Sequence, residues 1–288
     1  MKYFILAARP KTLLAGIIPP LVSYFYFHSA TDQHRVAWGI LCMAGALFIQ
    51  LATNFFNDVI DFKKGADAKR VGPTRVSAAG LVNIKTVEFW AWCCLVAAAM
   101  IGIPIIIRGG WPFIILGLIS LYLTFGYTGG KVSLAYRGLG ELFVFLFFGL
   151  FSVIGSYYIY AKSVDSRSMT LAAIYGLLAT TFICINNLRD RETDAEVGKK
   201  TLATRMSADA YRKLTLVTIF LPYLLLIHFH SYRLLPITLL AIIPAIVLAR
   251  IAIKKSGAEL NEALKFSGIH LIVFSILLCG VFLSEHQV

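Results

Sequence analysis

Long stretches without a charged residue recur along this sequence and limit what it can fold into. A helix needs about 20 mainly apolar residues to cross a hydrocarbon core of roughly 30 Å. The runs are continuous rather than alternating, which favours helices over a transmembrane β-barrel. We therefore expect one all-α membrane domain over residues 1–288, with nine transmembrane helices. The runs lie near residues 12–29, 38–57, 89–107, 111–128, 142–161, 169–187, 214–230, 234–249 and 267–284.

Composition and charge placement agree with this class. The chain is 58% hydrophobic and 15% charged, with a mean hydropathy of +0.76, too apolar for a water-soluble domain. With nine spans, 22 of the 27 lysines and arginines fall on the side of the N-terminus and five on the other. Basic loops mark the cytoplasmic side, so we expect an inner-membrane protein with its N-terminus and the loops 62–85 and 188–212 in the cytoplasm. The net charge of +12 then reflects topology, and no nucleic-acid partner is expected.

The second apolar run ends in the polar stretch NFFNDVIDFKKGAD, residues 54–67. On a helix of 3.6 residues per turn, Asn54, Asp58 and Asp61 lie on one narrow face. Ionisable groups at membrane depth are costly and usually face a cavity. The stretch therefore predicts a polar site at the cytoplasmic end of this helix.

A second acidic segment, NNLRDRETDAEVGKKTLATR, ends the sixth run. Asn186, Asn187, Asp190 and Asp194 share an arc of about 100° on the helical wheel, whereas Glu192 points away from it. Both segments place asparagine four residues before an aspartate, and both continue into basic loops of equal spacing, KRVGPTR and KKTLATR. These matches suggest two related four-helix units plus one helix, with the site between them and the loops as a cap.

The donor chemistry of the two segments favours a hard cation. Histidine and cysteine at metal-ligand spacing are missing from both, and oxygen-only ligands suit Mg²⁺, which commonly binds through one or two carboxylates plus substrate phosphates. Lys69, Arg75, Lys199 and Arg205 follow the acids and would neutralise remaining phosphate charge. We expect a Mg²⁺-bound diphosphate on a lipid, with the metal stabilising the departing charge. The candidate ligands are Asn54, Asp58, Asp61, Asp67, Asn187, Asp190 and Asp194.

Two other interpretations of the acids remain. Acids near a helix end can simply mark the water interface, although here they oppose the helix dipole and lie among lysines. Intramembrane acids and internal repeats also occur in transporters. A transporter would place its acids near the middle of the bilayer, however, and these run straight into basic loops.

At this point the chain resembles a known family, the UbiA superfamily of intramembrane prenyltransferases. The NxxxDxxD and NxxxDxxxD segments are similar to the two aspartate-rich motifs of that family. Several stretches resemble the branch that acts on 1,4-dihydroxy-2-naphthoate in menaquinone synthesis. Asp67 follows Asp61 by six residues rather than four, which is similar to that branch and unlike the 4-hydroxybenzoate branch. These stretches are ARPKT, FNDVIDFKKGAD, VGPTRV, AYRGLGELFVFLFFG and NNLRDRETDAEVGKKTLATR.

The resemblance implies transfer of a polyprenyl chain from polyprenyl diphosphate to the aromatic acceptor, with loss of CO₂ and demethylmenaquinol as product. It implies that Asn54, Asp58, Asp190 and Asp194 coordinate Mg²⁺–diphosphate, assisted by Asp61 and Asp67, and that Arg75, Lys199 and Arg205 bind phosphate oxygens. The alternatives are another acceptor within the superfamily or, less favoured, transport. The sequence specifies neither the prenyl chain length nor the oligomeric state.

Three further features have two interpretations each. Arg9 and Lys11 either contact the carboxylate of the acceptor or only mark topology. Arg137 either contacts substrate or forms an i,i+4 ion pair with Glu141. The phenylalanines of FVFLFF, residues 143–148, either line a tunnel for the prenyl tail, where aromatic faces would stabilise a carbocation, or only pack against helices and lipid.

Overall fold

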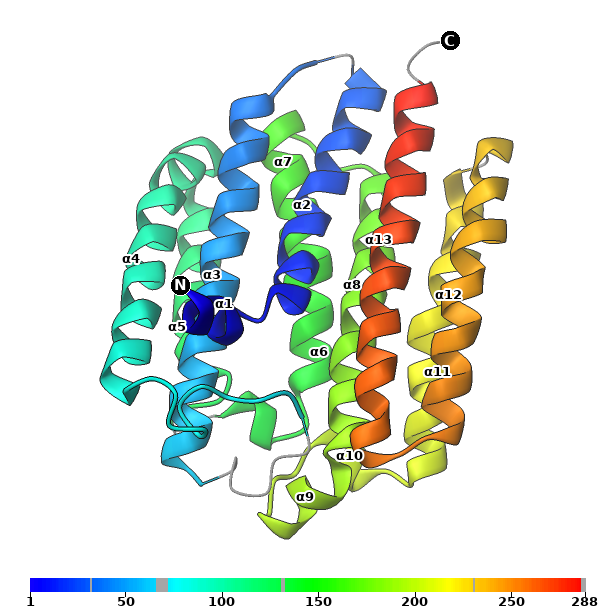
Figure 1. The fold of residues 1–288 in the computed structure, drawn as a ribbon. Coiled ribbons are helices and arrows are strands. Elements are labelled where there is room, and N and C mark those ends of the chain that lie inside the picture. Colours follow the sequence, from blue (N-terminus) through cyan, green and yellow to red (C-terminus); the bar gives the residue numbers. More distant parts are fainter. Residues whose placement is uncertain (32, 66–71, 131–132, 230, 286–288) are drawn as a thin grey trace.

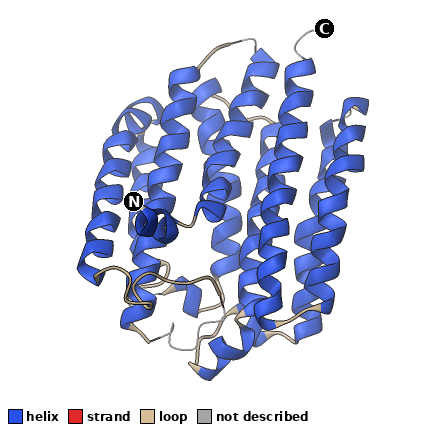
Figure 2. Cartoon of the chain, in the orientation of Figure 1, coloured by secondary structure: helices blue, strands red, loops and turns tan. Residues whose placement is uncertain are grey.

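The computed structural model describes residues 1–31, 33–65, 72–130, 133–229 and 231–285, and this part contains helices and no strand (Figures 1 and 2). The α-helices are α1 (Lys2–Ala8), α2 (Pro10–Thr31), α3 (Val36–Lys63), α4 (Ile84–Gly109), α5 (Trp111–Gly126), α6 (Gly140–Val144), α7 (Gly155–Ala161), α8 (Ser166–Arg189), α9 (Arg191–Glu196), α10 (Leu202–Arg205), α11 (Ala208–Leu225), α12 (Leu235–Lys254) and α13 (Leu260–Glu285). The tighter or wider turns are η1 (Leu134–Tyr136), η2 (Phe145–Ile154), η3 (Leu226–Phe229), η4 (Tyr232–Leu234) and η5 (Gly257–Glu259), of which η2 is a π-helix.

The helical membrane class expected from the sequence is confirmed, but the count of nine spans is not. Within the described residues, seven helical segments are long and apolar enough to cross a membrane. The expected span at 111–128 corresponds to α5, which has only 16 residues, or roughly 24 Å at 1.5 Å per residue. The expected span at 234–249 corresponds to α12, which has 20 residues.

The helices run roughly side by side, and the acidic segments emerge at the same end of the bundle. In Figure 1 the ends of α3 and α8, the loop before α4 and the short helices α9 and α10 all lie at the bottom, whereas the C-terminus lies at the top. The two-unit internal repeat stays a prediction. The two acidic segments are nevertheless brought to one end, as the topology of the predicted spans requires.

Helix α8 is the central element of the bundle. It packs against η2, α11, α13 and α2, and 72% of its apolar window is buried, more than in any other of the seven spans. Glycines allow η2 to approach α8 very closely, because a Cβ added at Gly149 would lie 2.4 Å from the carbonyl oxygen of Ala172. Small residues permit such close crossings in membranes. This contact places η2 against the first half of α8, at Ala172 and Gly176.

Candidate active site

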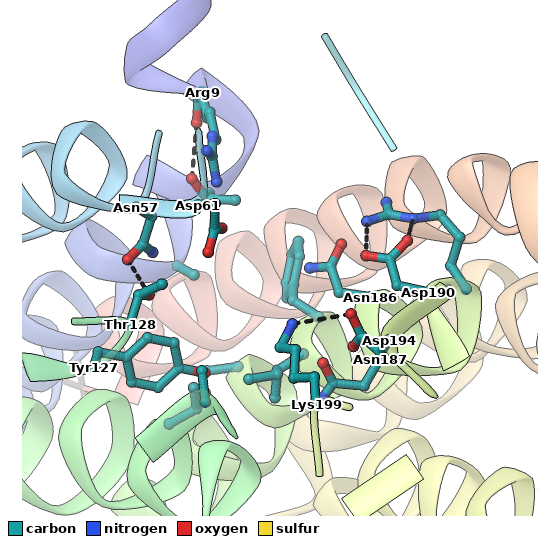
Figure 3. Close-up of a pocket in the computed structure, with 18 of the residues that line it drawn as sticks. Arg9, Asn57, Asp61, Tyr127, Thr128, Asn186, Asn187, Asp190, Asp194 and Lys199 are labelled. Carbon is teal, nitrogen blue, oxygen red and sulfur yellow. Dashed lines mark hydrogen bonds and ion pairs between the residues drawn. The ribbon is translucent and has the colours of Figure 1, made fainter. Parts of the chain in front are cut away.

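A cavity of about 220 Å³ lies between the ends of α3 and α8. Figure 3 shows Asn57 and Asp61 on one side of it and Asn186, Asp190 and Asp194 on the other. The two acidic segments of the sequence therefore contribute to one site, as expected. The polar lining residues are Arg9, Thr12, Gln50, Asn57, Asp61, Arg75, Tyr127, Thr128, Asn186, Asn187, Arg189, Asp190, Thr193, Asp194 and Lys199.

Helix α3 presents a different face to the cavity from the one that the sequence suggested. Asn57 and Asp61, one turn apart, line it, whereas Asn54 and Asp58 do not. Neighbouring residues on a helix differ by about 100° in direction. The orientation of α3 about its own axis therefore decides whether Asn57 or Asp58 faces the cavity. Asn57 was visible in the sequence as a polar residue in the same stretch, but the rotation of the helix was not.

Asn54 and Asp58 are buried in contacts that hold neighbouring segments. Asn54 is 3% exposed, and its Nδ2 donates to the carbonyl oxygen of Ala8 at 2.8 Å and to Thr12 Oγ1 at 3.0 Å. Asp58 is 1% exposed, and its carboxylate accepts from the backbone N–H groups of Val76 and Ser77. In this structure Asn54 secures the junction of α1 and α2, and Asp58 anchors the loop that carries Arg75. Their metal-binding role remains a prediction.

The second segment turns at Asp190, where α8 ends and α9 begins. Backbone bonds from Asp190 to Asn186 and from Asp194 to Asp190 nevertheless keep the four-residue spacing across the turn. Asn186, Asn187, Asp190 and Asp194 consequently share the cavity wall. Glu192 is exposed, as the wheel predicts.

Each carboxylate of the cavity is paired with one basic side chain. Arg75 Nη2 lies 2.6 Å from Asp61 Oδ2, and Lys199 Nζ lies 3.2 Å from Asp194 Oδ1. Arg189 donates to both carboxylate oxygens of its neighbour Asp190, each at 2.7 Å (Figure 3). Bidentate pairs of this kind are the stronger ones. The cavity is therefore lined by similar numbers of acidic and basic side chains. Such a lining can bind a cation and an anion together.

Asp194 is the least compensated carboxylate of the cavity. It is 8% exposed, and its Oδ2 is buried without a hydrogen-bond partner in the described part of the chain. Burial raises the pKa of Asp194 and the charges of Asp190 and Asp61 add to this, although Lys199 acts to lower it. A buried carboxylate oxygen without a partner is costly, and a bound cation would relieve that cost.

The predicted basic residues divide into two groups. Arg9, Arg75 and Lys199 line the cavity. Lys11, Arg137 and Arg205 are exposed and are not among its lining residues. Of the two interpretations of Arg137, the ion pair with Glu141 is not formed, because Glu141 contacts Asn187 and Tyr211; contact of Arg137 with substrate stays a prediction. Asp67 and Lys69 lie outside the described residues.

A second, larger hollow of about 550 Å³ extends from the polar cavity along α3, α4, α5 and η2. Its lining is mainly apolar, and it includes Phe143, Phe147 and Phe148 of the FVFLFF stretch together with Phe151. The two hollows are adjacent because they have lining residues in common, namely Gln50, Asn57, Tyr127, Val144 and Phe148. We call the larger one the apolar groove.

Several residues of the site were not picked out from the sequence. Gln50, Tyr127 and Thr128 line the cavity, and Thr128 donates a hydrogen bond to Asn57 Oδ1 (Figure 3). Tyr127 and Thr128 lie directly after α5, far from either acidic segment in the sequence. Single polar residues at the end of an apolar run carry no spacing signal, so nothing in the sequence marked them.

Comparison with known proteins adds an independent line of information. Residues 2–282 match the UbiA prenyltransferase family. A 1,4-dihydroxy-2-naphthoate octaprenyltransferase from Mycobacterium tuberculosis is 31% identical over 95% of this chain and 94% of its own length. The protein of that name from Haemophilus influenzae is 35% identical over 70% of this chain and 68% of its own length.

Solved structures show the same fold. A UbiA homolog from Archaeoglobus fulgidus bound to DMAPP and Mg²⁺ superimposes with a TM-score of 0.70 at 15% identity, over 99% of both chains. The apo structure of a UbiA homolog from Aeropyrum pernix K1 gives 0.69 at 14% identity, over 96% of this chain and 98% of the other. At these identities the likeness concerns the fold alone.

Proposed function

This chain belongs to the UbiA prenyltransferase family, and from that premise we propose that it transfers a polyprenyl chain from polyprenyl diphosphate to 1,4-dihydroxy-2-naphthoate, with Mg²⁺ as cofactor. The aromatic acceptor is supported by the names of relatives 31–35% identical to it. The diphosphate donor and Mg²⁺ are supported by the fold shared with a homolog bound to DMAPP and Mg²⁺.

The observation that carries the proposal is the adjacency of the polar cavity and the apolar groove. A prenyl diphosphate has a highly charged head and a long hydrocarbon tail. The cavity offers Arg9, Arg75 and Lys199 to the head, and the groove offers a mainly apolar lining to the tail. A charged cavity that opens into an apolar groove of about 550 Å³ therefore supports a substrate with a diphosphate head and a long prenyl tail.

The donor set of the cavity fits a divalent ion bound together with phosphate. Within the described residues, no three His, Cys, Asp or Glu side chains are close enough to form a metal site by themselves. Mg²⁺ typically uses one or two carboxylates and takes its remaining ligands from phosphate and water. Asp61, Asp190 and Asp194 would hold it, and the partnerless Oδ2 of Asp194 is the atom best prepared to do so. When bound, Mg²⁺ neutralises charge that develops on the diphosphate.

The residues of the chain would orient the reactants and exclude water. Arg75 and Lys199, which here pair with Asp61 and Asp194, would bind the diphosphate oxygens. Tyr127 and Phe148 line both hollows, so their rings would flank the first carbons of the prenyl chain. An aromatic face stabilises an adjacent cation by about 0.5–2 kcal/mol.

The proposed reaction breaks two bonds and forms one new carbon–carbon bond. The bond between the prenyl carbon and the diphosphate oxygen breaks, and diphosphate leaves with the electron pair. The prenyl carbon then bonds to the ring carbon that carries the carboxylate. Loss of CO₂ returns the electron pair of the ring–carboxylate bond to the ring, which gives demethylmenaquinol.

We also propose an orientation in the cytoplasmic membrane. The loops after α3 and α8 carry many of the basic residues, and they lie at the same end as the cavity (Figure 1). By the positive-inside rule that end faces the cytoplasm. The water-soluble acceptor and the Mg²⁺ cofactor would then both enter from the cytoplasm.

The test uses purified protein in nanodiscs with 1,4-dihydroxy-2-naphthoate, a polyprenyl diphosphate and Mg²⁺. We expect the prenylated product and CO₂ by mass spectrometry, and no product with Asp194→Ala or with EDTA. Glu192→Ala, which removes an exposed acid of the same helix, is the matched control and should remain active. Product only with a different phenol would overturn the acceptor, and no product with any acceptor would overturn prenyl transfer.

A further inference from the structure

Glu141 is a buried acid that the proposed reaction does not use. It lies in the first turn of α6 and is 6% exposed. Its Oε1 accepts hydrogen bonds from Asn187 Nδ2 at 2.8 Å and from the hydroxyl group of Tyr211. Its Oε2 is buried and has no hydrogen-bond partner in the described part of the chain. An acid so deeply buried without a basic partner is costly, which points to a role beyond packing.

Close packing fixes Glu141 in this place. A Cβ added at the preceding residue, Gly140, would lie 2.9 Å from the hydroxyl oxygen of Tyr127 and 3.0 Å from Ile183 Cδ1. The first turn of α6 is therefore pressed against Tyr127 of the cavity wall and against α8. Glu141 consequently has little freedom to move away from Asn187.

The contact with Glu141 decides which end of the Asn187 carboxamide faces the cavity. A carboxylate only accepts hydrogen bonds, and a carboxamide has a donor end and an acceptor end. Because Asn187 directs its amino group at Glu141, its carbonyl oxygen is turned away from Glu141. Asn187 lies beside Asp194 in the cavity wall (Figure 3), so that oxygen is available to the site.

Asn57 on the opposite wall is oriented the other way. Its Oδ1 accepts from Thr128 Oγ1, which leaves its amino group available to the cavity. Amino groups donate to phosphate oxygens, whereas a carbonyl oxygen suits a hard cation. The two amides would thus recognise opposite charges, with the acceptor oxygen on the wall that carries Asp190 and Asp194.

We propose that Glu141 is a positioning residue that turns the Asn187 oxygen into the cavity as a ligand of the divalent cation. This inference rests on the proposed function, because it assumes that a cation binds there with a prenyl diphosphate. A glutamine at position 141 offers a donor as well as an acceptor, so it would no longer fix which end of the Asn187 carboxamide faces it, and that carboxamide could rotate by half a turn. Its amino group would then face the cation and repel it.

The experiment measures metal binding directly, by titrating Mn²⁺ into nanodisc-embedded protein with a prenyl thiodiphosphate that cannot react, followed by electron paramagnetic resonance. We expect Glu141→Gln to weaken Mn²⁺ binding about 10- to 100-fold, the usual effect of removing a group that orients a metal ligand. The double variant Glu141→Gln/Asn187→Asp should restore binding, because aspartate presents an oxygen at either end while glutamine donates to the other.

This rescue separates positioning from structural support. If Glu141 only held α6 against α8, Asn187→Asp would raise Mn²⁺ binding by the same factor in the wild type and in Glu141→Gln, because it adds a carboxylate to both, and the proposal would be wrong. Wild-type affinity in Glu141→Gln would overturn it equally. Asn187→Ala leaves Glu141 untouched and should show the same loss, so the test survives poor folding of Glu141→Gln. Absence of Mn²⁺ binding in the wild type would instead overturn the metal site of the proposed function.

Tyr211→Phe is the matched control for the network. It removes the other hydrogen bond to Glu141 Oε1 but leaves the carboxylate that faces Asn187. We expect a lower unfolding temperature with Mn²⁺ affinity close to that of the wild type. A loss as large as that of Glu141→Gln would mean that general loosening, rather than the orientation of Asn187, governs metal binding.

Discussion

Ser77 donates its backbone N–H to Asp58 Oδ1 at 3.0 Å. The most deeply buried acid of the first motif therefore binds the protein's own backbone. Arg75, two residues earlier, lies on the same loop and pairs with Asp61 at 2.6 Å. A single carboxylate thus fixes the loop that delivers an arginine to the cavity.

We expect Asp58→Ala to destabilise the protein as well as to impair activity. Removing the carboxylate leaves two buried N–H groups without acceptors, each costing about 1–3 kcal/mol. Thermal unfolding in detergent measures the effect, with the exposed acid Asp209 changed to alanine as the control. An unfolding temperature equal to the wild type would contradict the anchoring role and favour Asp58 as a metal ligand alone.

Arg75 and Arg205 were both predicted from the sequence to bind phosphate, and the structure distinguishes them. Arg75 lines the cavity, whereas Arg205 is exposed. A hydrogen bond to a charged group contributes about 1.5–3 kcal/mol, so Arg75→Ala should raise the KM for prenyl diphosphate roughly tenfold to a hundredfold. Arg205→Ala should change it little. Steady-state kinetics with a varied donor concentration measures both, and equal effects would contradict the cavity assignment.

The apolar groove predicts a chain-length effect at Gly102. This glycine lines the groove, and a Cβ added there would meet no atom within 4 Å. Gly102→Leu should therefore fold normally yet narrow the groove. Overpacking costs about 1–3 kcal/mol, so we expect kcat/KM for long prenyl diphosphates to fall about tenfold or more while a two-isoprene donor is little affected.

The control for Gly102 is Gly280→Leu on α13, where an added Cβ also meets no atom within 4 Å and which is outside the groove. It should leave the activity with both donors unchanged. If Gly102→Leu lowered the activity with short and long donors alike, the groove would not be the binding site of the tail.

We expect Asp165, at the end of the bundle away from the cavity, to make the stability of the folded protein depend on pH. It caps α8 by accepting from Ser168 N at 2.6 Å, and Tyr157 donates to it at 2.7 Å. Partial burial acts to raise the pKa of Asp165, but hydrogen bonds from Tyr157, Ser168 and Tyr26 bring it below the usual 3.8. The stabilisation is therefore full above the unfolded pKa and is lost as the pH falls through the lower folded pKa.

Asp165→Ala should cost about 1 kcal/mol or more at pH 7, the typical contribution of an N-cap. The difference in unfolding temperature from the wild type should shrink as the pH falls below 3.8. Thermal unfolding at several pH values measures this, with Ser207→Ala at the cap of α11 as a control whose effect should not depend on pH. A constant difference for Asp165→Ala would contradict the role of its charge.

The sequence by itself determined the class of this protein and the chemistry of its site. Uncharged runs about 20 residues long permit only helices that satisfy their own backbone hydrogen bonds in lipid. Asp61, Asp190 and Asp194 were identified as site residues because acids at the end of such runs are costly unless they serve a site. Topology then required both segments to emerge on one side, and the cavity is found there.

The tertiary structure decided which atoms of those segments face the cavity. Asn57 replaces Asp58 because packing against α1, α2 and the loop at Ser77 sets the rotation of α3, and one residue of a helix turns the direction by about 100°. Tyr127 reaches the site from the end of α5, and Glu141 contacts Asn187 where α6 meets α8. Such pairings depend on how separate helices pack, which local spacing in the sequence does not encode.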